Sequence, residues 1–168
     1  MAVTDTPRRP PATAPAPRPP YRAYAGIMGT FAGGLAAAGL LARALGREAH
    51  DGDAIDLAVL ALATFKTSRT IARDDVTSFI RAPFVEGDGH GDDTPKETGD
   101  LQQAIGELVT CSRCVGTWAA AGLATTQIVA PRFGRVLAWS LAAAAANDFL
   151  QAGFVALTQA SNRLEARP

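Results

Sequence analysis

The chain has 168 residues, of which 48% are apolar and only 19% are charged. Sixteen basic residues balance sixteen acidic ones, so we expect no nucleic-acid partner, because such partners are bound through a net positive surface. Two cysteines are too few for the disulfide framework of a small secreted domain. The most informative feature of the sequence for predicting its fold and location is therefore its long uncharged runs.

The first 22 residues are predicted to form a disordered tail. Pro, Ala, Thr and Arg dominate this stretch, without apolar periodicity. Such a composition buries too little surface to offset the entropy lost on folding. A Pro-x-x-Pro ligand for a recognition domain is the alternative, and we favour an unpatterned tether.

A first transmembrane helix is predicted over residues 23–45. The 19 residues from Tyr24 to Ala42 carry no charge, and as a helix they would extend about 28 Å, close to the thickness of a bilayer core. Small residues recur at every fourth position, a pattern that lets another helix approach closely. The alternative is a signal peptide cleaved near Ala44, but the apolar run is longer than those of signal peptides.

Three further apolar segments follow, at residues 54–73, 114–130 and 136–162. The first of them is the weakest, because its uncharged part is too short to span a bilayer unless Asp56 and Lys66 lie at the two interfaces. A buried or interfacial helix is the alternative there. The sequence therefore predicts an all-α, polytopic membrane bundle of three or four transmembrane helices.

A polar loop at residues 74–110 separates these segments. Asp74 and Asp75 are expected to begin a short helix that ends before Pro83, because the residue before proline avoids the helical conformation. Asp100 and Gln103 form a capping pair for a second short helix. We expect this loop to lie at a membrane surface.

The basic residues predict the orientation of the chain. With four spans, twelve of the sixteen Lys and Arg residues lie in the tail, the segment from Lys66 to Arg113 and the C-terminus. The positive-inside rule then places both termini in the cytoplasm. The predicted location is the cell membrane, with a multi-pass topology.

Two ordered motifs, at residues 64–84 and 106–118, resemble the DUF1360 family of small bacterial integral membrane proteins of unknown function. The resemblance covers about residues 54–160. It implies a membrane location and supplies no catalytic residue. The residues that carry it are Phe65, Lys66, Arg69, Asp74, Arg81, Pro83 and Phe84 in the first motif and Gly106, Glu107, Leu108, Cys111, Cys114, Gly116 and Trp118 in the second.

Cys111 and Cys114 are the candidate metal ligands. Two thiols at this spacing supply half of a tetrahedral zinc site or form a redox dithiol. A complete zinc site needs two more ligands, from His90 with Asp92 or Asp93, or from a second chain. We favour a third interpretation, in which the two residues pack a turn.

Charged residues supply the remaining candidate sites. Arg69 and Arg81, with Lys66 and Arg73, are expected to form a basic cluster that contacts anionic lipid headgroups. A specific pairing with Asp74 or Glu107 is the alternative.

Asp148 lies near the middle of a span at residues 136–158. A lone carboxylate there is costly, so we expect it to be protonated, paired or turned toward the bundle interior. Candidate partners are Thr125, Thr126 and Gln127. The alternative ends the span at Asn147 and leaves Asp148 among the headgroups.

These features favour a non-enzymatic membrane protein whose cytoplasmic loop contacts lipid headgroups or a protein partner, with a second copy of the chain as one such partner. The sequence contains no nucleotide-binding loop and no Ser/His/Asp grouping. The alternative is a membrane thiol–disulfide oxidoreductase or a metal-binding protein that uses Cys111 and Cys114.

Overall fold

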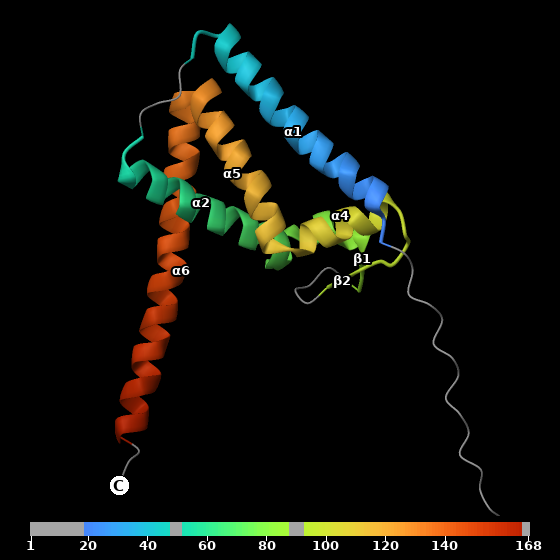
Figure 1. Cartoon of the computed structure of the whole chain (residues 1–168). Helices are drawn as coiled ribbons and strands as arrows, with labels where there is room; N and C mark the ends of the chain where they lie inside the picture. The colour runs from blue at the N-terminus through green and yellow to red at the C-terminus, as the bar shows by residue number, and fades with distance from the viewer. Residues whose placement is uncertain (1–18, 48–51, 88–92, 166–168) are drawn as a thin grey trace, which may run out of the picture.

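The computed structural model describes residues 19–47, 52–87 and 93–165, and most of these residues are helical (Figure 1). Of the tail predicted at residues 1–22, residues 1–18 lie outside the described residues, and Tyr21 and Arg22 were wrongly included in it, because they are the first residues of α1. The long helices are α1 (Tyr21–Ala44), α2 (Ala54–Arg73), α5 (Ser112–Val129) and α6 (Pro131–Glu165). Short elements lie between α2 and α5: η1 (Asp75–Thr77), α3 (Ser78–Arg81), η2 (Ala82–Phe84), β1 (Val85–Glu86), β2 (Thr94–Pro95) and α4 (Leu101–Thr110).

Side-chain caps explain where two of the helices begin. The Asp53 carboxylate accepts hydrogen bonds from the first backbone N–H groups of α2. Asp100 does the same for α4, and Gln103 accepts from the N–H of Gly99, so the predicted capping pair is confirmed. Hydrogen bonds from the Thr98 hydroxyl and the Gln102 N–H lower the pKa of Asp100.

The core forms where α2 packs against α5 and α6. Its buried members are small or branched: Val59, Ala63, Leu123, Ala138 and Ala142. Alanine at these positions lets the helix backbones approach closely, as in membrane helix pairs. The resulting core is compact but narrow, and it buries only one stretch of each helix.

Two glycines of the second motif pack closely against the first motif. A Cβ added to Gly106 of α4 would lie 2.6 Å from the carbonyl oxygen of Phe84, and one added to Gly116 of α5 would contact Ser68 of α2. The two sequence motifs therefore pack directly against each other. This juxtaposition could not be derived from their spacing alone.

Helix α1 leans away from the core (Figure 1). The aromatic ring of Phe31 on α1 contacts the ring of Trp118 on α5, and the two ring centroids are 5.0 Å apart. A Cβ added to Gly29, Gly33 or Gly34 would meet nothing within 4 Å. At these three glycines no described helix packs on α1, although the small-residue pattern would allow a close approach.

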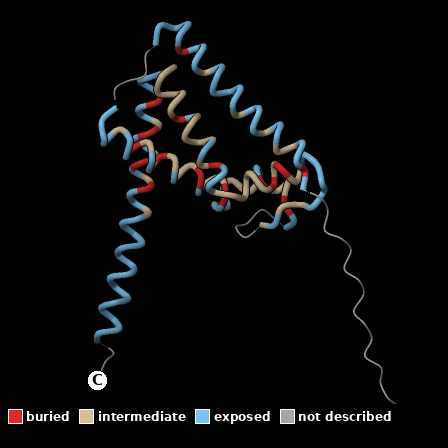
Figure 2. Tube along the Cα trace, viewed as in Figure 1, coloured by how far each residue is buried: buried red, intermediate tan, exposed pale blue. Residues whose placement is uncertain are grey.

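Helix α6 continues far beyond the core. Its 35 residues correspond to about 52 Å of helix, and residues 149–164 are exposed along its protruding half (Figure 2). Large apolar side chains lie on this half, among them Phe149, Leu150, Phe154 and Leu157.

Length and apolar composition qualify two helices of the described chain to cross a membrane, at Tyr21–Ala44 and Pro131–Leu164. The all-α prediction is therefore confirmed in outline, apart from the unpredicted two-residue strands β1 and β2. Helices form at the two other predicted spans, α2 and α5, but by the same measure they do not qualify as spans.

Candidate functional site

The polar segment between α2 and α5 folds into one unit, which we call the polar cap and which comprises the described residues 74–87 and 93–110. Its helix α4 contacts β2, η2 and α5 as well as both α1 and α2. The polar cap therefore touches three of the four long helices. It lies at the end of the bundle where α2 ends and α5 begins (Figure 1).

A fully buried arginine holds this cap to α2. The Nη1 of Arg81 donates to the carbonyl oxygens of Ile71 (2.7 Å) and Asp74 (3.1 Å) and to the hydroxyl of Thr77 (2.9 Å). Its Nε is 3.2 Å from a carboxylate oxygen of Asp93. Because Ile71 is one of the last residues of α2, the guanidinium satisfies a carbonyl that the helix itself leaves unpaired.

This burial corrects the predicted basic cluster. Arg81 is not exposed, so it does not reach lipid headgroups, and among the described residues its carboxylate partner is Asp93 rather than Glu107 or the carboxylate of Asp74. Arg69 is exposed on α2, and the Asp74 carboxylate accepts a hydrogen bond from Thr70 at 2.9 Å.

Glu107 links the polar cap to α1. It accepts one hydrogen bond from the hydroxyl of Tyr24 and another, at 2.9 Å, from the side-chain amide of Gln103. The predicted site residue Glu107 therefore joins the start of α1 to α4. Tyr24 was not predicted, because nothing near it in the sequence indicates a carboxylate 83 positions away.

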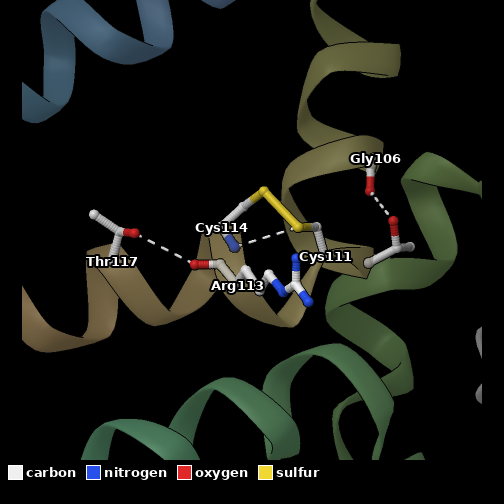
Figure 3. Close-up of a disulfide and its surroundings, with 6 residues drawn as sticks. Gly106, Cys111, Arg113, Cys114 and Thr117 are labelled. Carbon is white, nitrogen blue, oxygen red and sulfur yellow. Dashed lines mark hydrogen bonds between the residues drawn. A yellow bond between two sulfur atoms is a disulfide. The ribbon is translucent and has the colours of Figure 1, made fainter. Parts of the chain in front are cut away.

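Cys111 and Cys114 are joined by a disulfide at the start of α5 (Figure 3). Cys111 is the N-terminal capping residue of α5, and its sulfur accepts a hydrogen bond from the N–H of Cys114. Cys114 is exposed, whereas Cys111 is half-buried. A thiolate at a helix N-terminus is stabilised by the helix, so the position suits redox chemistry.

Zinc binding would require the reduced form of this pair, because disulfide sulfurs are not thiolate ligands. No group of three or more potential metal ligands gathers within residues 19–47, 52–87 and 93–165. Of the further ligands considered, His90 and Asp92 lie outside the described residues. Asp93 is paired with Arg81.

The comparison with known families is consistent with this arrangement. A family model described as "Protein of unknown function (DUF1360)" matches residues 59–154, which include the polar cap and both motifs. The chain belongs to the DUF1360 family. It is also 29% identical over 99 residues to the UPF0713 protein YngL of Bacillus subtilis (strain 168), a match that covers 55% of this chain and 73% of that protein. No solved structure matches.

The part that matches DUF1360 excludes α1. It contains the Arg81 network, the disulfide and the core between α2, α5 and α6. Several family-motif residues make the contacts described above: Gly106 against Phe84, Gly116 against Ser68, and Arg81 at the end of α2. In this chain those residues hold the fold together.

Asp148 is paired with Lys66 of α2 at 2.8 Å. The expectation of a paired carboxylate thus agrees with the contact, but the partner is none of the residues proposed on the preceding helix. Next to the pair, the rings of Phe65 and Phe149 stack with centroids 5.2 Å apart. On α2 and on α6, one residue therefore contributes the charge (Lys66, Asp148) and its neighbour in sequence contributes the aromatic ring (Phe65, Phe149).

Replacement of the buried guanidinium tests the structural role of Arg81. We expect Arg81→Met to destabilise the fold by about 3–5 kcal/mol, because it leaves the Asp93 carboxylate buried without its partner. The exposed Arg69→Met is the matched control, and it should stay within about 0.5 kcal/mol of wild type. Thermal unfolding in detergent measures both, and equal stability of the two variants would contradict this role.

The Lys66–Asp148 pair is tested by a double-mutant cycle. Asp148→Leu should destabilise the bundle by about 1–3 kcal/mol, because Lys66 loses its partner. The double change Lys66→Met/Asp148→Leu should restore stability toward wild type, since neither charge is then left unpaired. An unchanged or raised unfolding midpoint for Asp148→Leu alone would show that the pair does not stabilise the protein.

Proposed function

We propose that this DUF1360 protein is a non-enzymatic, multi-pass membrane protein in which α1, α2, α5 and α6 cross the bilayer in alternating directions. In this proposal the polar cap and both termini face the cytoplasm. The polar cap then presents its exposed surface to lipid headgroups or to a protein partner.

The observation that carries the proposal is the apolar surface of α1 and α6. Soluble proteins rarely expose large contiguous apolar patches, and a helix that is apolar all round is typical of a membrane span. Large apolar side chains are exposed along both helices: Met28, Leu35, Leu40, Leu41, Val136, Trp139, Phe149, Leu150, Phe154, Val155 and Leu157.

The positions of the helix ends support alternating crossings. Near the polar cap, the start of α1 contacts α4 through Tyr24 and Glu107, and Ser68 of α2 contacts α5. At the opposite end, Gly46, Gly52 and Pro131 line one cavity. Helices α1, α2 and α5 therefore run between these two ends, and α6 starts at the end away from the polar cap.

The lengths of α2 and α5 also fit this proposal. Helix α2 has 20 residues and α5 has 18, which gives about 30 and 27 Å, near the thickness of the hydrocarbon core. Their polar residues would be tolerated because α1 and α6 flank them and because Lys66 is paired with Asp148.

The charge distribution supports the orientation. Most of the Lys and Arg residues lie in the tail, the polar cap or its neighbouring helix ends, and the C-terminus, as expected for cytoplasmic segments. The exceptions are Lys66, which is paired with Asp148 within the proposed spans, and Arg43, Arg47, Arg132 and Arg135. Exposed arginines near the polar cap, such as Arg69 and Arg113, would each add about 1 kcal/mol of attraction to anionic headgroups.

Cysteine labelling in intact bacterial cells tests this topology. The background is Cys111→Ser/Cys114→Ser, with single cysteines introduced by Leu45→Cys, Phe133→Cys or Glu97→Cys. A membrane-impermeant maleimide should label the first two in intact cells. It should label Glu97→Cys only after the cells are permeabilised, and this labelling also shows that the introduced thiol is reactive. Labelling of Glu97→Cys in intact cells would overturn the orientation.

The disulfide favours a second candidate function, a membrane thiol–disulfide oxidoreductase. In that reaction a substrate dithiol would be oxidised to a disulfide while the Cys111–Cys114 disulfide takes up two electrons and two protons to give two thiols. A quinone or another disulfide would have to reoxidise the pair. Stable cytoplasmic disulfides are rare, so the two candidates differ in the side on which they place the polar cap.

The redox state of the wild-type pair separates these candidates. Cells are quenched in acid, and free thiols are counted by alkylation. Our proposal expects both thiols to be reduced, and zinc-bound thiols would resist alkylation until a chelator is added. A disulfide in resting cells, or thiols labelled from outside, would favour the oxidoreductase.

A further inference from the structure

A cavity of about 620 Å³ opens at the end of the bundle that lies away from the polar cap. Its wall combines the end of α1, the start of α2 and the junction of α5 with α6, three regions that are distant in sequence. α1 ends and α5 meets α6 at the top of Figure 1. Polar and aromatic side chains in its lining are Arg47, Asp56, Gln127, Arg132, Arg135 and Trp139.

The described lining residues of this cavity carry an unbalanced charge. Three arginines face one carboxylate, Asp56, among its described lining residues. The structure gives none of Arg47, Arg132 or Arg135 a salt bridge to a carboxylate of the described chain. Uncompensated guanidinium groups around one cavity favour an anionic ligand, because their donors match carboxylate and phosphate oxygens.

The rest of the lining is apolar. Val59 is buried beneath the cavity, Ile128 is half-buried, and Trp139 contributes an indole ring. The volume is in the range of small-molecule sites, which combine an apolar wall with a few polar groups that orient the ligand. A ligand that fits both parts carries its negative charge at one end of an apolar body.

We propose that this cavity binds a phosphate group carried on an apolar chain, with Arg132 and Arg135 as the principal ligands of the phosphate. Arg132 lies in the first turn of α6 and Arg135 at the start of the second, and the unpaired N–H groups at the start of this helix add partial positive charge. Arg47 approaches from the end of α1. Asp56 opposes the bound anion and so limits its affinity.

This inference goes beyond the proposed membrane topology and holds whichever side the cavity faces. It gives a ligand to Arg47, Arg132 and Arg135, which lie outside the proposed cytoplasmic segments. A membrane phospholipid and a soluble phosphate compound share the recognised group, and the experiment below separates them.

Fluorescence of Trp139 tests the proposal in the full chain purified in an uncharged maltoside detergent. The background is Trp118→Phe, which leaves Trp139 as the single tryptophan. Dodecyl phosphate is the first probe and inorganic phosphate the second. We expect dodecyl phosphate to change the emission of Trp139 in a saturable way.

Variants that are expected to change the affinity for dodecyl phosphate in opposite directions make the test specific. Arg132→Gln/Arg135→Gln should weaken dodecyl phosphate binding about tenfold or more, because charged hydrogen bonds are lost. Asp56→Asn should tighten it, because the one opposing carboxylate is removed. Arg22→Gln/Arg163→Gln is the matched control for net charge, with both arginines exposed elsewhere, and should bind like the parent.

The outcomes separate the ligand sources. Saturation by dodecyl phosphate alone supports a membrane phospholipid, whereas competition by inorganic phosphate at the same concentration supports a soluble phosphate compound. The proposal is overturned if neither probe gives a saturable change. It is equally overturned if Arg132→Gln/Arg135→Gln, with its helical content intact by circular dichroism, binds dodecyl phosphate as the control does.

Discussion

The buried guanidinium of Arg81 is the contact on which the arrangement of this protein depends. It bonds to the last turn of α2, to the turn that follows and to Asp93, so a single side chain ties together three successive parts of the chain. A buried cation is stable only when such partners surround it. Its position fixes the polar cap against α2, and the cap in turn orients α4 toward Tyr24 of α1.

Close approach of small residues completes this arrangement. Gly106 lets α4 pack on the carbonyl of Phe84, and Gly116 lets α5 pack on Ser68. The residues that define the family motifs therefore meet in space as packing and hydrogen-bonding groups. These motif residues therefore have structural roles in this chain. Among the motif contacts described, the disulfide at the start of α5 is the one with redox chemistry of its own.

Local signals in the sequence predicted much of the helical structure. The uncharged runs and the cap at Asp100 depend on neighbouring residues, so α2 and α4 agree with expectation. The predicted helix end before Pro83 was wrong, because Ala82 is itself helical and the 3-10 turn η2 includes the proline. Long-range contacts were not predictable in the same way. The burial of Arg81, its choice of Asp93 among several similar acids, and the meeting of Arg47 with Arg132 depend on the packing of distant segments, which no local pattern encodes.

The proposed topology places the exposed apolar surface of α6 in lipid. Spin labels attached through Leu150→Cys, Phe154→Cys and Leu157→Cys, in the Cys111→Ser/Cys114→Ser background, measure this directly in lipid nanodiscs. The account predicts frequent collisions with dissolved oxygen and few with a water-soluble nickel complex at all three positions, and the reverse for a label at Arg163→Cys. Frequent nickel collisions at positions 150, 154 and 157 would contradict it.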